Sequence, residues 1–87
     1  MMSIQFDQPM NKETQNLIEK LFGDKVVAYD DQNIILERIN QFNQSEFKAL
    51  ANEAGQPVTL ELHDQDDIVE MKDGTRYRVT EHGWKKI

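Results

Sequence analysis

Four potential metal ligands, one imidazole and three carboxylates, fall within the run from His63 to Asp67. Carboxylate oxygens suit hard cations, and imidazole suits borderline ones. The spacing matches neither the calcium loop of EF-hands nor a pair of histidines on one helical face. Aspartates are also typical of exposed turns, where their side chains bond to nearby backbone amides. We therefore expect a turn here, and keep as the alternative a metal site or enzyme centred on His63 with Asp64, Asp66 and Asp67.

The two histidines, His63 and His82, could each act as a general base near neutral pH. No serine nucleophile stands beside either one in a recognisable motif. Ser3 lies in the N-terminal segment, and Ser45 lies at an expected helix start. We therefore expect no catalytic residue, no metal and no obligatory cofactor, and we interpret the protein as non-enzymatic.

Basic chemistry is concentrated near the C-terminus of a chain whose net charge is −6. The candidate interaction surface there consists of Lys72, Arg76, Arg78, Trp84, Lys85 and Lys86. Basic residues interleaved with aromatic ones can hold single-stranded nucleic acid. The overall negative charge opposes non-specific binding to nucleic acid or to an anionic membrane, and arginine and tryptophan are enriched at protein binding hot spots. We favour a protein partner, with a nucleic-acid-associated role for this hairpin as the alternative.

A second candidate surface is acidic and would suit a basic partner. It consists of Asp30, Asp31, Asp64, Asp66 and Asp67. The remaining acidic excess is spread along the chain, as is typical of a solvated surface. Exposed edge strands offer a further contact, because two copies can pair through them to form a homodimer.

The best-defined element that positions these residues is a hairpin closed at Gly74. An Asp-Gly pair between two alternating runs is the strongest short-range hairpin signal. A two-residue loop would place an apolar residue opposite Arg76. A three-residue loop places Glu70 opposite Arg76 and Val69 opposite Tyr77, which pairs opposite charges on one face and apolar groups on the other. We predict the second register, with Gly74 in a left-handed conformation.

This register divides the hairpin into two faces. Four side chains point toward the core: Val69, Met71, Tyr77 and Val79. Ile68 is left outward beside Arg78, which is the weak point of the scheme.

The first helix is predicted to end at Phe22. Its apolar stripe follows the helical period: Met10, Thr14, Leu17, Ile18 and Leu21. Pro9 suits the first turn, and Asn11 is a second candidate for the start. Gly23 is predicted to end the helix in a left-handed conformation.

A second helix is predicted over residues 46–54. Its buried stripe consists of Phe47, Leu50, Ala51 and Ala54. Asn43 or Ser45 would cap its N-terminus, and Gly55 would end it.

Runs rich in β-branched residues predict strands over 25–29, 34–39 and 58–63. Residues 34–39 also fit a helical face, and we favour the strand. In residues 1–8 the alternation of Ile4 and Phe6 is consistent with either an edge strand or a mobile tail.

These elements predict one two-layer α+β domain over residues 1–87. The order is α-β-β-α-β-β-β, with an antiparallel sheet, two helices on one of its faces, and the last three strands as a meander. The absence of cysteine fits a reducing compartment, no apolar run approaches the ~18 residues of a membrane span, and the N-terminus does not resemble a signal peptide. We therefore expect a small cytoplasmic binding module or regulator that acts through protein–protein contacts.

Overall fold

The first sheet contains four strands, and all neighbouring strands run antiparallel. The computed structural model describes residues 1–37 and 44–87. The strands of this sheet are β1 (Met2–Phe6), β2 (Val26–Tyr29), β3 (Asn33–Leu36) and β4 (Val58–Leu62). They lie in the order β2-β3-β1-β4, so β1 and β3 are central while β2 and β4 form the edges.

The N-terminal segment is a central strand rather than an edge strand or a mobile tail. β1 pairs with β3 on one side and with β4 on the other. Met2, Ile4 and Phe6 alternate with Ser3 and Gln5, and all three are at most 5% exposed. Their burial fixes the register, because a slip by one residue would turn these side chains to the other face.

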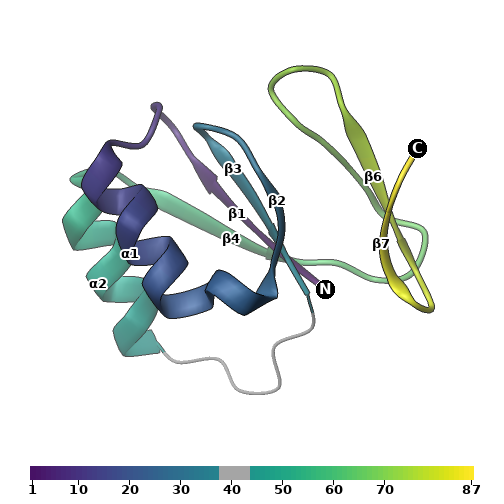
Figure 1. The fold of residues 1–87 in the computed structure, drawn as a ribbon, viewed down its shortest axis with the longest axis horizontal. Helices are drawn as coiled ribbons and strands as arrows, with labels where there is room; N and C mark the ends of the chain where they lie inside the picture. The colour runs from purple at the N-terminus through teal and green to yellow at the C-terminus, as the bar shows by residue number, and fades with distance from the viewer. Residues whose placement is uncertain (38–43) are drawn as a thin grey trace.

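Two helices cover one face of this sheet (Figure 1). They are α1 (Lys12–Phe22), followed by a short 3-10 turn η1 (Gly23–Lys25), and α2 (Gln44–Ala54). From β1 to β4 the chain follows the order β-α-β-β-α-β, in which two split β-α-β units interleave. The predicted α+β class, with both helices on one face of an antiparallel sheet, is confirmed. Such topologies host many unrelated functions, so this one assigns none by itself.

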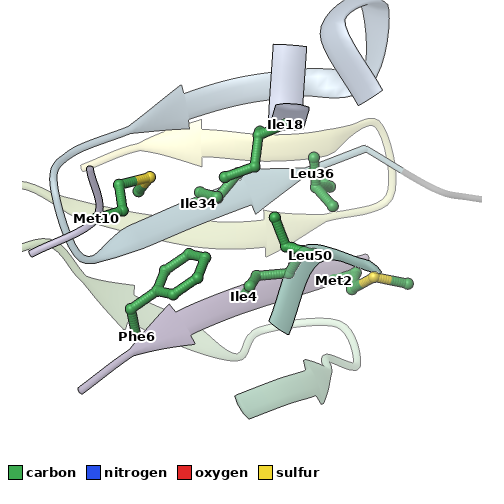
Figure 2. Close-up of a cluster of buried hydrophobic side chains, with 8 residues drawn as sticks. All are labelled: Met2, Ile4, Phe6, Met10, Ile18, Ile34, Leu36 and Leu50. Atoms are coloured by element: carbon green, nitrogen blue, oxygen red, sulfur yellow. The ribbon is translucent and has the colours of Figure 1, made fainter. Parts of the chain in front are cut away.

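The main core lies between the helices and this sheet, as Figure 2 shows. Its buried members come from β1, β3, both helices and the segment before α1: Met2, Ile4, Phe6, Met10, Ile18, Ile34, Leu36 and Leu50. None of them is more than 6% exposed. Removing this apolar surface from water is the dominant favourable contribution to folding.

The first helix begins at Lys12, so the start at Pro9 is wrong and the cap at Asn11 is confirmed. The Asn11 carboxamide oxygen accepts a hydrogen bond of 2.7 Å from the backbone N–H of Thr14, which satisfies a helix-end donor. The left-handed conformation predicted for Gly23 is also wrong. Its φ is −46°, and the chain tightens into η1 instead.

The second helix spans Gln44–Ala54 in the described residues, so Ser45 lies inside it. The alternative cap, Asn43, lies outside the described residues. Gly55 has a φ of 66° and ends the helix as predicted. Of residues 34–39, the described part forms strand β3 rather than a helix, and residues 38 and 39 fall outside the description.

The second sheet contains three antiparallel strands. They are β5 (Ile68–Glu70), β6 (Arg76–Thr80) and β7 (Gly83–Lys86). The predicted hairpin register is confirmed, since Glu70 pairs with Arg76 and Val69 pairs with Tyr77. Gly74 has a φ of 90°, the left-handed conformation that the three-residue loop requires.

The meander predicted for the last strands begins one strand later in the structure. β4 pairs with β1, not with β5, and β7 joins β6 as the third strand. The alternation of apolar residues identifies which face of a strand is buried, but it does not specify which strand lies beside it. The structure therefore contains two strands, β1 and β7, beyond those in the predicted order, and a second sheet.

The second sheet lies against part of the face of the first sheet that is turned away from the helices, so the protein has three layers rather than the predicted two (Figure 1). Ile35 alternates with the core residues of β3 and is nevertheless 0% exposed. The buried hydrophobic side chains of the second sheet are Val79 and, directly after β5, Met71. The Trp84 indole N–H donates a hydrogen bond of 2.8 Å to the carbonyl oxygen of Leu36, which ties β7 to β3. No helix within residues 1–37 and 44–87 is long and apolar enough to cross a membrane.

Candidate functional site

The outer face of the second sheet gathers basic and apolar side chains. Alternation along the strands places six residues on it: Ile68, Glu70, Arg76, Arg78, Lys85 and Ile87. Ile68, Arg78 and Lys85 form one row across the three strands. Glu70, Arg76 and Ile87 form a second row. Glu70 pairs with Arg76, and the Ile87 N–H donates a hydrogen bond of 2.9 Å to the Arg76 carbonyl. We call these six residues the cationic face.

The cations of this face are exposed and form no ion pair with any described residue. Among the residues that the structure describes, no carboxylate lies within ion-pair distance of Arg76, Arg78 or Lys85. The ion pair expected between Glu70 and Arg76 is therefore not formed, although the two residues are register partners. Ile68 is 46% exposed and Ile87 is 53% exposed. The face thus combines a local positive charge with apolar surface.

The other three residues of the predicted basic surface lie elsewhere. Lys72 is held by the β2–β3 turn, with its ammonium 3.1 Å from the Asp31 carboxylate. Lys86 is the register partner of Tyr77, so it lies on the opposite side of β7 from the cationic face. Trp84 is half-buried and points inward, as does Tyr77. The cationic face therefore carries no aromatic side chain.

Asp30 is the centre of the contact between the β2–β3 turn and the hairpin loop. Its carboxylate accepts a hydrogen bond of 2.7 Å from the Lys72 N–H and further bonds from the N–H groups of Gln32 and Asn33. Partial burial raises the pKa of Asp30, but these hydrogen bonds and one from the Asn33 side chain outweigh it and hold the pKa below its usual 3.8. This part of the predicted acidic surface therefore joins the two sheets.

The remaining acidic residues form the turn between β4 and β5, as predicted. The Asp66 N–H donates to the Val79 carbonyl at 2.8 Å, and the Val79 N–H donates to the Asp67 carbonyl at 2.9 Å. The Asp67 carboxylate accepts a hydrogen bond of 3.0 Å from the Asp64 N–H. Across residues 1–37 and 44–87, no group of three or more His, Cys, Asp or Glu side chains is placed to hold a metal ion. The five aspartates therefore lie in two places, at opposite ends of β5.

His63 lies at the junction of the two sheets, in contacts that the sequence did not reveal. Its Nε2 lies 2.7 Å from Ser3 Oγ, and its ring contacts Trp84 edge-on, with 5.3 Å between ring centroids. Glu61 and Asp67 lie 3.8 Å and 3.7 Å from its two ring nitrogens. Alternation along β1 and β4 would place Ser3 and His63 on one face, but only once these two strands are known to pair.

The order Ser3, His63, Asp67 resembles that of a hydroxyl nucleophile, its base and an orienting carboxylate. However, the 3.7 Å separation of His63 Nδ1 from the Asp67 carboxylate is too long for a hydrogen bond. Ser3 is 8% exposed and the His63 side chain is also 8% exposed, because the second sheet covers them. This geometry indicates that the Ser3–His63 contact is structural and stabilises the pairing of β1 with the end of β4.

Comparison with protein-family models, curated proteins and solved structures finds no match to this chain.

Proposed function

We propose that this protein is a small non-enzymatic binding module that holds an acidic segment of a partner protein on its cationic face. The main observation behind the proposal is that Arg76, Arg78 and Lys85 are exposed on one sheet face and form no ion pair with any carboxylate of the described chain. This is notable in a chain of net charge −6, where carboxylates to pair with them are plentiful. A partner carboxylate would supply the missing counter-charge.

The exposed isoleucines favour a protein segment over nucleic acid. Burying the remaining surface of Ile68 and Ile87 would contribute about 1 kcal/mol each, since full burial of such a side chain is worth roughly 1.5–3 kcal/mol. Each rim ion pair would add about 0–1 kcal/mol. Single-stranded nucleic acid is usually held by aromatic stacking, and the nearby aromatic residues Tyr77 and Trp84 point inward.

The expected complex is weak and reversible. A face of three short strands is smaller than the roughly 800 Å² that each partner buries in a standard interface. Such a contact is typical of transient recognition, in which charge raises the association rate. We place the module in the cytoplasm, since a cysteine-free chain suits a reducing compartment. Homodimerisation through an edge strand would leave this face accessible.

A heteronuclear NMR titration with a capped peptide of alternating glutamate and leucine tests the proposal. The peptide should shift the amide signals of β5, β6 and β7. Arg76→Ala/Arg78→Ala should weaken binding about tenfold or more, equivalent to about 1.4 kcal/mol. Lys86→Ala is the matched control, because it removes a cation from the other side of the same sheet and should leave the affinity unchanged.

The same titration with oligothymidine decides between the two partner classes. Tighter binding of the oligonucleotide than of the peptide, with a steep loss of affinity as salt rises, would favour the nucleic-acid alternative. If neither probe binds at about 1 mM, where the binding free energy is only about −4 kcal/mol, the proposal is wrong. Shifts confined to the first sheet would also contradict it.

A further inference from the structure

A pocket of about 300 Å³ opens between α1 and the β2 edge of the first sheet. Its floor is apolar and comes from the segment before α1, from α1, from β2 and from β3: Met10, Ile18, Val26 and Ile34. This volume is at the small end of the range for ligand pockets. It suits one large side chain better than a whole cofactor.

The strand beside the pocket has an unpaired edge. Within the described sheet, β2 pairs only with β3, and an irregularity in register falls between Val26 and Ala28. The Asp30 N–H bonds to the Asn33 carbonyl. The backbone groups of Asp30 therefore point toward β3. In an antiparallel edge strand the backbone groups of successive residues point alternately toward the neighbouring strand and away from it, so the N–H and carbonyl of Tyr29 point away from the sheet. Val27 and Tyr29 are 38% and 64% exposed. Such an edge can accept an extended peptide as an additional strand.

The pocket rim is suited to a guanidinium group. Glu19 supplies a carboxylate that has no ion-pair partner among the described residues. Gln15 and Asn16 supply amide oxygens, and Tyr29 supplies an aromatic ring. Arginine can bond a carboxylate with two parallel N–H groups and stack on an aromatic face, while its methylene stem packs on apolar surface. The four groups together favour arginine over a neutral or acidic side chain.

We propose that the β2 edge binds an extended peptide as an added strand and that an arginine of this peptide enters the pocket beside Glu19. Backbone hydrogen bonds to Tyr29 would hold the peptide without regard to its sequence. The pocket would then select the residue, as side-chain pockets do in other strand-addition complexes. This site lies on the first sheet and is independent of the cationic face.

Two peptides that differ in one group test this site. Both are capped heptapeptides of alternating threonine and valine, one with arginine at its centre and one with citrulline, which is similar in shape but uncharged. In an NMR titration the arginine peptide should shift the amide signals of Val27 and Tyr29. The citrulline peptide should bind about tenfold more weakly, because it lacks the charge-assisted bond to Glu19.

Variants on α1 assign the effect to one carboxylate. Glu19→Gln should reduce the affinity for the arginine peptide to that of the citrulline peptide. Glu13→Gln is the matched control, since Glu13 is an exposed residue on the same helix that does not line the pocket. This variant should bind the arginine peptide with the affinity of the wild type.

Several results would overturn the proposal. Equal affinity for the two peptides would rule out the arginine pocket. N-methylation of alternate residues removes backbone donors from the arginine peptide. If the methylated peptide binds as well as its parent, strand addition is ruled out. Absence of shifts in β2 at about 1 mM peptide would rule out both. Shifts of the β2 amides with protein concentration alone, without peptide, would show that a second copy of the chain occupies the edge instead.

Discussion

The two sheets of this protein are held in different ways. In the first sheet four side chains pack against the two helices, and each is at most 1% exposed: Ile4, Phe6, Ile34 and Leu36. The second sheet and its hairpin loop contribute only two buried hydrophobic side chains, Met71 and Val79. It is joined to the first sheet by polar contacts, among them the Trp84–Leu36 hydrogen bond and the Asp30–Lys72 hydrogen bond.

This difference predicts an order of opening. Regions with few buried apolar contacts open at lower free energy than the rest of a domain. The second sheet should therefore detach locally while the first sheet and its helices stay folded. The proposed cationic face lies on the less stable layer, and the proposed arginine pocket lies on the more stable one.

The largest effect should come from the core of the first sheet. Phe6→Ala should lower the free energy of unfolding by about 3–5 kcal/mol, because it removes a buried ring and leaves a cavity. Urea denaturation followed by circular dichroism measures this loss. Leu62→Ala is the control, because Leu62 is 78% exposed and surface changes usually stay within about 0.5 kcal/mol. Similar losses for the two variants would contradict the assignment of the core.

The next effect should be confined to the second sheet. Trp84→Phe removes the indole donor and leaves the Leu36 carbonyl without this partner, which should cost about 1–2 kcal/mol. Amide hydrogen exchange should accelerate in β5, β6 and β7 and remain unchanged in β1 and β3. Uniform acceleration through both sheets would show that they open as one unit and would remove the distinction between them.

Ser3→Ala should have a smaller effect of about 1 kcal/mol, the typical contribution of one hydrogen bond. It removes the hydroxyl that His63 contacts at 2.7 Å, so the amides of β1 and the end of β4 should exchange faster. An ester hydrolysis assay with p-nitrophenyl acetate provides the contrary outcome. If the wild type hydrolyses the ester and the variant does not, while stability stays unchanged, Ser3 is a nucleophile and the structural interpretation fails.

Local signals predicted the β5–β6 hairpin of the second sheet well. The Asp-Gly turn and the pairing of opposite charges correctly predicted that Glu70 lies opposite Arg76. The same register predicted that Ile68 points outward, and Ile68 is exposed. These residues are close in sequence, so turn geometry and cross-strand neighbours are sufficient to specify them. Sequence did not predict that Glu70 and Arg76 would remain unpaired at their charged ends, because side-chain rotamers depend on the surrounding surface.

The pairing of strands that are far apart in the chain could not be predicted from the sequence. The central place of β1 depends on its contacts with β3 and β4, strands that follow it by more than twenty residues. The contact between Ser3 and His63 has the same origin. Alternation placed each residue on a face, but several strand orders satisfy the same alternation, and the relative energies of those orders depend on tertiary packing. The pocket beside Glu19 likewise exists only once α1 lies against β2.

The smallest effect concerns the link between the β2–β3 turn and the hairpin loop. Because hydrogen bonds hold the pKa of Asp30 below its unfolded value of 3.8, its charged form stabilises the fold above about pH 4, and this contribution is lost as pH falls through the folded-state pKa. Asp30→Asn should lower stability at about pH 7 by less than about 1 kcal/mol, since the carboxylate is only partly buried and solvent screens its interactions. It should also flatten the dependence of stability on pH below about pH 4.

Urea denaturation across this acid range, for the wild type and the variant, measures the difference. Asp64→Asn provides a charge control, because it removes one exposed carboxylate without touching the contact to Lys72. An acid dependence in Asp30→Asn equal to that of the wild type would mean that Asp30 does not couple the two sheets. In that case the Trp84–Leu36 hydrogen bond and the Lys72–Asp31 ion pair would be the main polar links between the two sheets, and the second sheet should detach more readily still.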